Sequence, residues 1–191
     1  MKSVKGTETE KNLLKSFAGE SQARMMYDYF ASVARKEGYE MVAEIFDETA
    51  KNEREHAKKF FGFLEGGSVE ITASYPAGKI GTTLENLKAA AMGEHEEYTE
   101  LYPHFADIAE KEGFQEIAIL YKGVANVEKH HEQRYLKLAE LIEKKKMFAR
   151  EVPKLWKCRN CGHIHQGEEA PVKCPVCAHP QSYFEVLCED F

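Results

Sequence analysis

The feature that most constrains this chain is an internal repeat, in which two helical seams are interrupted at the same point by a glutamate and a histidine. The stretches 39–65 and 114–145 each space apolar or aromatic residues alternately by four and three positions, as bundle helices do. Glu-x-x-His breaks this seam once in each stretch, 75 positions apart. The two pairs are Glu53 with His56 and Glu128 with His131. The pattern predicts two related helical units that each carry metal-binding side chains on a buried face.

Four helices are predicted, at 7–37, 39–65, 82–112 and 114–145. Thr-x-x-Glu capping boxes open the first and third, and glycines stand where helices would end. Tight turns at Gly38 and Gly113 make the first two helices one antiparallel hairpin and the last two another. The middle connection, 66–81, contains Pro76 and is long enough for a crossover between the hairpins. We expect a mainly α fold, a four-helix bundle with one long crossover, as in ferritin-like bundles.

The repeat shifts by one residue within the third helix. Tyr27 aligns with Tyr102 at a spacing of 75 residues, whereas Glu20 aligns with Glu94 at a spacing of 74. One extra residue must therefore lie between Glu94 and Tyr102. A helix absorbs such an insertion most readily as a π-bulge, and such bulges cluster at functional sites. We predict a π-bulge in this segment.

Glu20 and Glu94 complete a set of donors that suits a pair of metal ions. In di-iron and di-manganese carboxylate bundles, two helices each supply one glutamate and the other two each supply Glu-x-x-His. Four carboxylates on an apolar seam would each cost several kcal/mol of desolvation, which bound metal ions offset. The predicted ligands of this dinuclear site are Glu20, Glu53, His56, Glu94, Glu128 and His131.

Three further residues are candidates for the same site. Glu97 lies one turn beyond Glu94, where the first helix has Ala23. The inserted residue favours a fifth carboxylate ligand at Glu97 over the alternative of an exposed surface glutamate. Tyr27 and Tyr102 occupy matched seam positions, and a buried tyrosine hydroxyl needs a partner such as a ligating carboxylate. The alternative for both tyrosines is a purely structural role in the core.

All five cysteines lie near the C-terminus, and four of them form a strong metal signature. Two Cys-x-x-Cys doublets supply four thiolates for a tetrahedral site. The doublets are Cys158 with Cys161 and Cys174 with Cys177. Their spacing does not separate structural zinc from electron-carrying iron. Cys188 lies outside the doublets, and we expect it to be a free thiol.

Composition argues against several kinds of partner. The net charge is −6 and no basic stripe is present, so we expect neither nucleic acid nor an anionic membrane surface as a partner. No apolar run approaches the roughly 18 residues of a membrane helix. The N-terminal segment lacks the apolar region of an export signal, so we expect a cytoplasmic protein. The expected domains are a helical bundle at 1–147, a linker at 148–153 and a small metal-bound domain at 154–191.

These motifs resemble those of the rubrerythrins, in which a ferritin-like di-iron bundle precedes a rubredoxin-like domain. The resemblance extends over essentially the whole chain. It is carried by AGESQAR around Glu20, EREH around Glu53 and His56, GEHEEY around Glu94 and Glu97, the Glu128 and His131 pair, and WKCRNCG and CPVCAHP around the four cysteines. Ala178 stands where simple rubredoxins have a glycine. The implied fold is a ferritin-like four-helix bundle followed by a small rubredoxin-like β/loop domain.

The resemblance implies a peroxidase that reduces hydrogen peroxide to water at two non-haem iron ions. Electrons would pass through an Fe(Cys)4 centre, where zinc remains possible, from an external rubredoxin or an NAD(P)H-dependent reductase. One iron would move between His56 and Glu97 with redox state, which makes these two residues, with Tyr27 and Tyr102, the candidate catalytic residues. A head-to-tail homodimer is also implied, with the rubredoxin-like domain of one subunit beside the di-iron site of the other.

Three other functions share parts of this pattern. A ferritin-like ferroxidase or iron-storage protein would have the same bundle but no use for an attached electron-transfer domain. A zinc ribbon carried on a structural bundle would leave the seam carboxylates unexplained. A di-iron oxygenase would need an apolar cavity beside the metal ions, which a sequence does not reveal.

Overall fold

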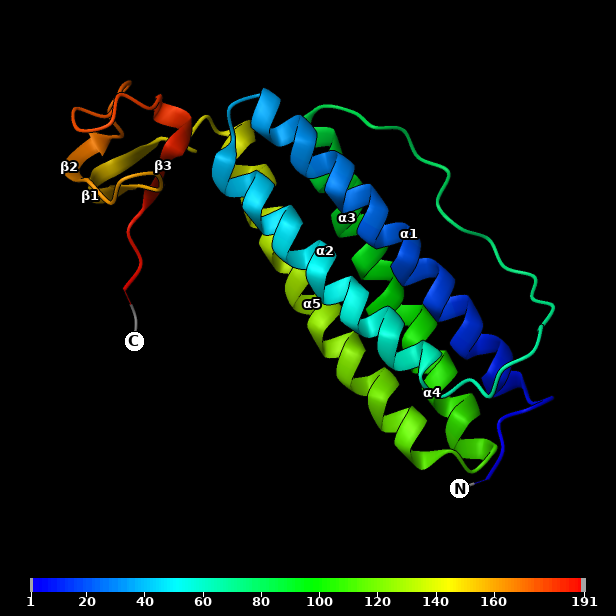
Figure 1. Ribbon diagram of the computed structural model, residues 1–191. Helices are drawn as coiled ribbons and strands as arrows, with labels where there is room; N and C mark the ends of the chain where they lie inside the picture. The colour runs from blue at the N-terminus through cyan, green and yellow to red at the C-terminus, as the bar shows by residue number, and fades with distance from the viewer. Residues whose placement is uncertain (1, 190–191) are drawn as a thin grey trace.

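Two helical hairpins pack together as a four-helix bundle, and a small three-stranded domain lies at one end of it (Figure 1). The computed structural model describes residues 2–189. The first hairpin consists of α1 (Glu8–Lys36) and α2 (Glu40–Phe61), and the second of α3 (Thr83–Glu96), the π-helix η1 (Glu97–Leu101), α4 (Tyr102–Lys111) and α5 (Gln115–Glu143). The predicted mainly α fold is confirmed. Among the described helices, none has both the length and the apolar character needed to cross a membrane.

The helices begin and end at the signals present in the sequence. Thr7 accepts a hydrogen bond from the first turn of α1, and Thr82 and Glu85 form a complete capping box at α3. Gly38 and Gly113 turn the chain between paired helices with φ of 83° at both positions. Glycine adopts this left-handed conformation without the steric cost that a Cβ atom would bring. Both hairpins therefore close in the same way.

The predicted π-bulge between Glu94 and Tyr102 is present as η1. The backbone N–H of Tyr102 donates to the carbonyl of Glu97, five residues earlier in the chain. In an α-helix the same N–H would donate to the carbonyl four residues earlier. Within this wider turn, the Thr99 hydroxyl donates to the carbonyl of His95 at 2.5 Å. The extra residue is thus absorbed while Glu94 and Tyr102 both stay buried.

The buried core forms two aromatic clusters, one on each side of the Glu-x-x-His pairs along α2 and α5. The first contains Tyr27, Phe30, Phe46 and Tyr135, with ring centroids 5.1 to 6.3 Å apart. The second contains Phe60, Tyr102, Phe105 and Tyr121, with ring centroids 5.0 to 5.7 Å apart. The polar donors between the clusters are therefore enclosed by apolar layers above and below.

The crossover between the hairpins, residues 62–82, runs along the outside of α1 (Figure 1). It is longer than predicted because α2 ends at an earlier residue. The Tyr75 hydroxyl donates to the carbonyl of Lys15 at 3.0 Å. The side chain of Gln22 donates to the carbonyl of Pro76 at 2.7 Å. These two hydrogen bonds tie the middle of the crossover to α1.

The C-terminal domain is an antiparallel sheet with strand order β2–β1–β3. Its elements are β1 (Ala149–Cys158), β2 (Ile164–Glu169), the 3-10 helix η2 (Gln181–Tyr183) and β3 (Phe184–Val186). Trp156 pairs with both outer strands and is fully buried in the core of this domain. β1 begins at Ala149, within the segment 148–153 expected as a linker. The strand register is irregular between Ala149 and Lys154, which accommodates Pro153.

The small domain contacts the bundle at the turn between α1 and α2. Phe148 stacks on Tyr39 with ring centroids 6.2 Å apart. Arg159 forms ion pairs with Glu44 of α2 and with Glu185 of β3. In Figure 1 this end of the bundle lies opposite the N-terminus. The domain therefore docks beyond the end of its own bundle and not alongside it.

Candidate metal centres

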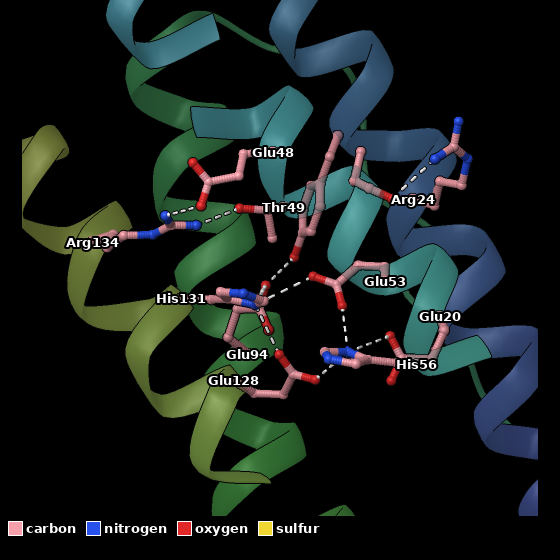
Figure 2. A network of polar contacts seen from close by, with 12 residues as sticks. Glu20, Arg24, Glu48, Thr49, Glu53, His56, Glu94, Glu128, His131 and Arg134 are labelled. Atoms are coloured by element: carbon pink, nitrogen blue, oxygen red, sulfur yellow. Dashed lines mark hydrogen bonds and ion pairs between the residues drawn. The ribbon is translucent and has the colours of Figure 1, made fainter. Parts of the chain in front are cut away.

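The two Glu-x-x-His pairs face one another across the bundle, one from α2 and one from α5 (Figure 2). The Nδ1 atom of His56 lies 2.8 Å from Glu53 Oε2 and 3.0 Å from Glu128 Oε1. The Nδ1 atom of His131 lies 2.8 Å from Glu128 Oε2 and 3.3 Å from Glu53 Oε1. Each of these glutamates thus presents one oxygen to each histidine. This arrangement suits two carboxylates that bridge a pair of ions, with one histidine on each ion.

Glu20 of α1 and Glu94 of α3 add one further carboxylate on each side. Glu20 Oε2 lies 3.7 Å from His56 Nδ1, and Glu94 Oε1 lies 3.6 Å from His131 Nδ1. The six donors form two overlapping groups, and within each group the donor atoms all lie within 4.8 Å of one another. The groups are Glu20, Glu53, His56 and Glu128, and Glu53, Glu94, Glu128 and His131. The six side chains predicted to form a dinuclear site are therefore brought together.

Most polar atoms of these donors are buried and, within the described part of the chain, lack hydrogen-bond partners. They include both oxygens of Glu53 and of Glu128, one oxygen of Glu20, and the Nδ1 atoms of both histidines. A buried carboxylate without compensation costs several kcal/mol. Two divalent cations would compensate this charge, and a mixed nitrogen and oxygen donor set suits iron or manganese. The residues present therefore fit a dinuclear metal centre.

The pKa values in the cluster show how strongly it opposes uncompensated charge. Burial raises the pKa of Glu94 to about 8 and that of Glu20 well above its usual range. Burial also opposes ionisation of Glu53, but the neighbouring imidazoles outweigh it and lower the pKa of that carboxyl to about 2. Burial alone would lower the pKa of His131, but the surrounding carboxylates raise it to about 11. Protons therefore balance the charge when metal is absent, and metal binding must displace them.

Tyr27 and Tyr102 each connect one hairpin to a donor of the other. The Tyr27 hydroxyl donates to Glu94 Oε1 at 2.6 Å, and the Tyr102 hydroxyl donates to Glu20 Oε1 at 2.5 Å. Burial raises the pKa of both phenols well above the usual value, so both remain protonated donors. Each tyrosine thereby holds one outer carboxylate in place. In Glu20 the other oxygen, Oε2, faces His56, whereas in Glu94 the oxygen bound by Tyr27 is also the one that faces His131.

Glu97 lies beside the cluster, at the start of η1, but belongs to neither group of close donors. It is partly exposed and lines a cavity between α1, α3 and the crossover. Burial of its carboxyl raises the pKa well above the usual range, and the charges of Glu20 and Glu94 add to this effect. The structure thus places Glu97 in the wall of a cavity next to the donors, while its role as a fifth carboxylate ligand stays a prediction.

The sequence patterns did not identify a polar link beside the cluster. Arg134 of α5 donates to the Thr49 hydroxyl at 2.9 Å and to Glu48 at 2.8 Å (Figure 2). This links α5 to α2 one turn from both Glu-x-x-His pairs. The Tyr135 hydroxyl on the same side is buried and has no hydrogen-bond partner among the described residues. The only signal in the sequence was Thr49, a hydroxyl residue within an otherwise apolar part of the seam.

The second centre lies in the C-terminal domain, where four sulfur atoms lie within 4.8 Å of one another. They belong to Cys158, Cys161, Cys174 and Cys177. The two turns that present them include Gly162 with φ of 78° and Ala178 with φ of 63°. Cys188 lies outside the cluster and is an exposed free thiol, and the four clustered cysteines form no disulfide. Four converging thiolates suit a tetrahedral iron or zinc ion.

Family comparisons account for both centres in a single chain. The rubrerythrin model matches residues 11–139, and the model of the rubrerythrin, rubredoxin-like domain matches residues 156–185. The chain belongs to the rubrerythrin family. It is 60% identical to the rubrerythrin of Porphyromonas gingivalis over 97% of this chain and 93% of that protein. It is 55% identical to the rubrerythrin of Clostridium perfringens over the full length of both.

A solved structure of nigerythrin in its fully reduced, all-ferrous state has the same architecture. It is 30% identical to this chain, with a TM-score of 0.63 over 97% of this chain and 92% of that one. This rubrerythrin-family protein therefore has a di-iron ferritin-like site in its bundle and a four-cysteine rubredoxin-like site in its C-terminal domain. The ferritin-like and rubredoxin-like parts of the sequence prediction are confirmed.

Proposed function

We propose that this protein is a cytoplasmic non-haem di-iron peroxidase that reduces hydrogen peroxide to water and protects against oxidative stress. The observation that carries the proposal is the presence, in one chain, of a two-metal carboxylate site and a four-thiolate site. Peroxide reduction consumes two electrons, which a pair of iron ions supplies when bound, and an Fe(Cys)4 centre returns electrons singly. The external donor would be a rubredoxin or an NAD(P)H-dependent reductase.

The residues around the cluster would have separate roles in such a reaction. Glu53 and Glu128, which each contact both histidines, would hold the two ions, and Tyr27 and Tyr102 keep the outer glutamates oriented. Glu97 stands in the cavity wall on the open side of the cluster. In the proposal, Glu97 would serve as the alternative to His56 as a ligand of one ion when the redox state changes. A carboxylate that joins the site then offsets the added positive charge.

We also propose that the working unit is a head-to-tail homodimer. Two features support it: the small domain docks beyond the end of its own bundle, and an aromatic cluster around Phe46 lies between that end and the six donors. A partner placed head to tail would bring its four-cysteine site alongside the donors. Sedimentation and turnover measured across a dilution series test this: rubredoxin-dependent turnover should fall as the dimer dissociates, and a fully active monomer would exclude the dimer.

The test of the peroxidase is anaerobic mixing of fully reduced protein with stoichiometric hydrogen peroxide, while the visible band of Fe(III)(Cys)4 is followed. We expect the band to reappear quickly with peroxide and much more slowly with O2. Glu97→Ala should abolish the fast phase while leaving the band itself unchanged. A colourless protein would indicate zinc at the four cysteines and exclude the electron relay. A response to O2 but not to peroxide would favour a ferroxidase or an oxygenase.

A further inference from the structure

A cavity of about 1130 Å³ lies between α1, α3 and the crossover. Its lining is largely apolar and includes Ala23, Met26, Phe30, Ala90, Met92 and Phe105. Glu97, Tyr27 and Tyr102 are also part of this lining, so the cavity reaches the side chains that contact the outer glutamate donors. Pockets for small organic ligands typically occupy roughly 300–1,000 Å³ and are mostly apolar with a few polar groups. Hydrogen peroxide is small and polar, so its binding alone does not explain an apolar cavity of this size.

The crossover forms the outer wall of this cavity. It is bonded to α1 at Tyr75 and Pro76, as described above, and Gly81 exchanges two hydrogen bonds with the Asn86 side chain of α3, at 2.8 and 3.1 Å. Between these ties, residues 77–80 are exposed and line the cavity. The wall there is a single layer of chain. A small molecule that enters has to displace this segment and its exposed ion pair, between Lys79 and Glu85 of α3 at 3.5 Å.

We propose that the cavity binds organic hydroperoxides, with the apolar tail against α1 and α3 and the peroxide group directed toward Glu97. This inference rests on the proposed peroxidase function and names a second class of substrate for the same site. Met26, Phe30 and Met92 provide contacts for an alkyl or aryl tail. Glu97 is the carboxyl group of the cavity wall that lies beside the outer glutamate donors, so it marks the end of the cavity nearest the metal site.

The reaction balances in the same way as reduction of hydrogen peroxide. The O–O bond of the hydroperoxide breaks, and two electrons with two protons convert it into one alcohol and one water molecule. The two electrons would come from the same source as in the proposed function, a reduced pair of iron ions, and the rubredoxin-like centre would resupply them. The alcohol keeps the apolar tail, so it should also bind to the cavity, and its binding is measurable without turnover.

Binding is the first test. Isothermal titration calorimetry of the purified protein with 2-phenyl-2-propanol, the alcohol formed from cumene hydroperoxide, should show one site per chain. Ala89→Trp and Ala23→Trp place an indole at the cavity lining and should each weaken binding by about tenfold or more, a loss of about 1.4 kcal/mol. Ile119→Trp, on the exposed face of α5 away from the cavity, is the matched control and should bind as wild type does. Absence of binding by the wild type would overturn the proposal.

Turnover is the second test and separates this inference from the proposed function. In wild type, cumene hydroperoxide should be reduced to its alcohol, and Ala89→Trp should lower that kcat/KM by about tenfold while the value for hydrogen peroxide stays within about twofold. Equal effects of Ala89→Trp on both substrates, or no effect on either, would overturn the cavity assignment. Consumption of O2 with hydroxylation of cumene would also overturn it, in favour of an oxygenase. Failure to reduce hydrogen peroxide would instead refute the peroxidase, whereas alcohol binding would still report on the cavity.

Discussion

The two hairpins of the bundle contain nearly the same ligand pattern, yet they differ by one residue in the helix that precedes each Glu-x-x-His helix. In the first hairpin α1 runs unbroken for 29 residues. In the second, η1 interrupts the corresponding helix between α3 and α4. The six close donors follow the symmetry, three from each hairpin. Glu97 is the exception, because it aligns in the repeat with Ala23. The insertion therefore leaves one side of the metal site with an additional carboxyl group that the other side lacks.

The first prediction is the largest in effect and removes one residue from each of the two helices. Deletion of Met25 from α1 should abolish folding, because it rotates Tyr27 and Phe30 away from the core by about 100° relative to Glu20. The burial lost would exceed the roughly 5–15 kcal/mol by which a domain is stable. Deletion of Thr99 from η1 should leave a folded protein, because it only removes the residue that makes the helix wide.

Circular dichroism and thermal melting of the two deletion variants provide the measurement. The Thr99 variant should melt cooperatively with an α-helical spectrum, and its reaction with peroxide should slow, because Glu97 then lies on a regular helix as Ala23 does. The comparison between hairpins would fail if the Met25 deletion folded normally, or if the Thr99 deletion did not fold at all.

The second prediction exchanges the residues at the matched positions. Burial and neighbouring acidic groups raise the pKa of Glu97, so its carboxyl opposes folding when no metal is bound. Glu97→Ala should therefore stabilise the metal-free protein by about 1–3 kcal/mol, and Ala23→Glu should destabilise it by a similar amount. Urea unfolding of metal-free protein at pH 7 measures both. A loss of stability in Glu97→Ala would contradict the assignment of Glu97 as a residue kept for function.

The third prediction tests whether the two tyrosines are equivalent. Tyr27→Phe and Tyr102→Phe each remove one hydrogen bond to a buried glutamate and should each lower the free energy of unfolding by about 1–3 kcal/mol. Metal affinity should fall as well, because the glutamate is no longer held in position. Denaturant titrations and competition with a chelator measure the two effects. Tyr121→Phe, which affects only a 3.3 Å contact with Ser16, is the control and should have a smaller effect.

Sequence periodicity was sufficient to predict the six close donors and the π-bulge, because both depend on local helix geometry. A glutamate at a seam position must be buried once the helix packs, and a shift of the repeat by one residue must be absorbed within the helix. Arg134 could not be predicted in the same way, because it lies off the seam of α5 and its partner, Thr49, is on α2. Its contact depends on how far apart α2 and α5 lie, which no local pattern specifies.

The cavity and the residue at which β1 begins could not be predicted from the sequence, for a related reason. The path of the crossover depends on hydrogen bonds between distant residues, such as Tyr75 with Lys15. Ala149 joins the sheet by pairing with Glu169, although the lysines and Pro153 nearby resemble a linker in composition. In both segments the local residues permit several conformations, and contacts far along the chain select one.

The last and smallest prediction concerns the capping glutamates that the two hairpins share. Glu112, after α4, accepts hydrogen bonds from the backbone of Glu8 and from the backbone and hydroxyl of Thr9 at the start of α1. Glu37, after α1, accepts one from the backbone of Thr83 at the start of α3. Slight burial of the Glu112 carboxyl opposes ionisation, but these hydrogen bonds outweigh it and lower its pKa. The stabilisation is therefore present above the unfolded-state pKa, and it is lost as pH falls through the lower folded-state value.

Glu112→Gln should lower the free energy of unfolding at pH 7 by less than about 1 kcal/mol, because the carboxylate is only partly buried and solvent still screens its charge. The difference from wild type should shrink as the pH falls below the usual glutamate range, since wild type then also carries a neutral side chain. Glu37→Gln should cost less at pH 7, because it accepts one hydrogen bond where Glu112 accepts three. Urea unfolding of the metal-free variants at neutral and acidic pH measures this. An undiminished difference at acidic pH would show that Glu112 acts through packing, and equal losses in both variants would show that the capping is as symmetric as the donor set.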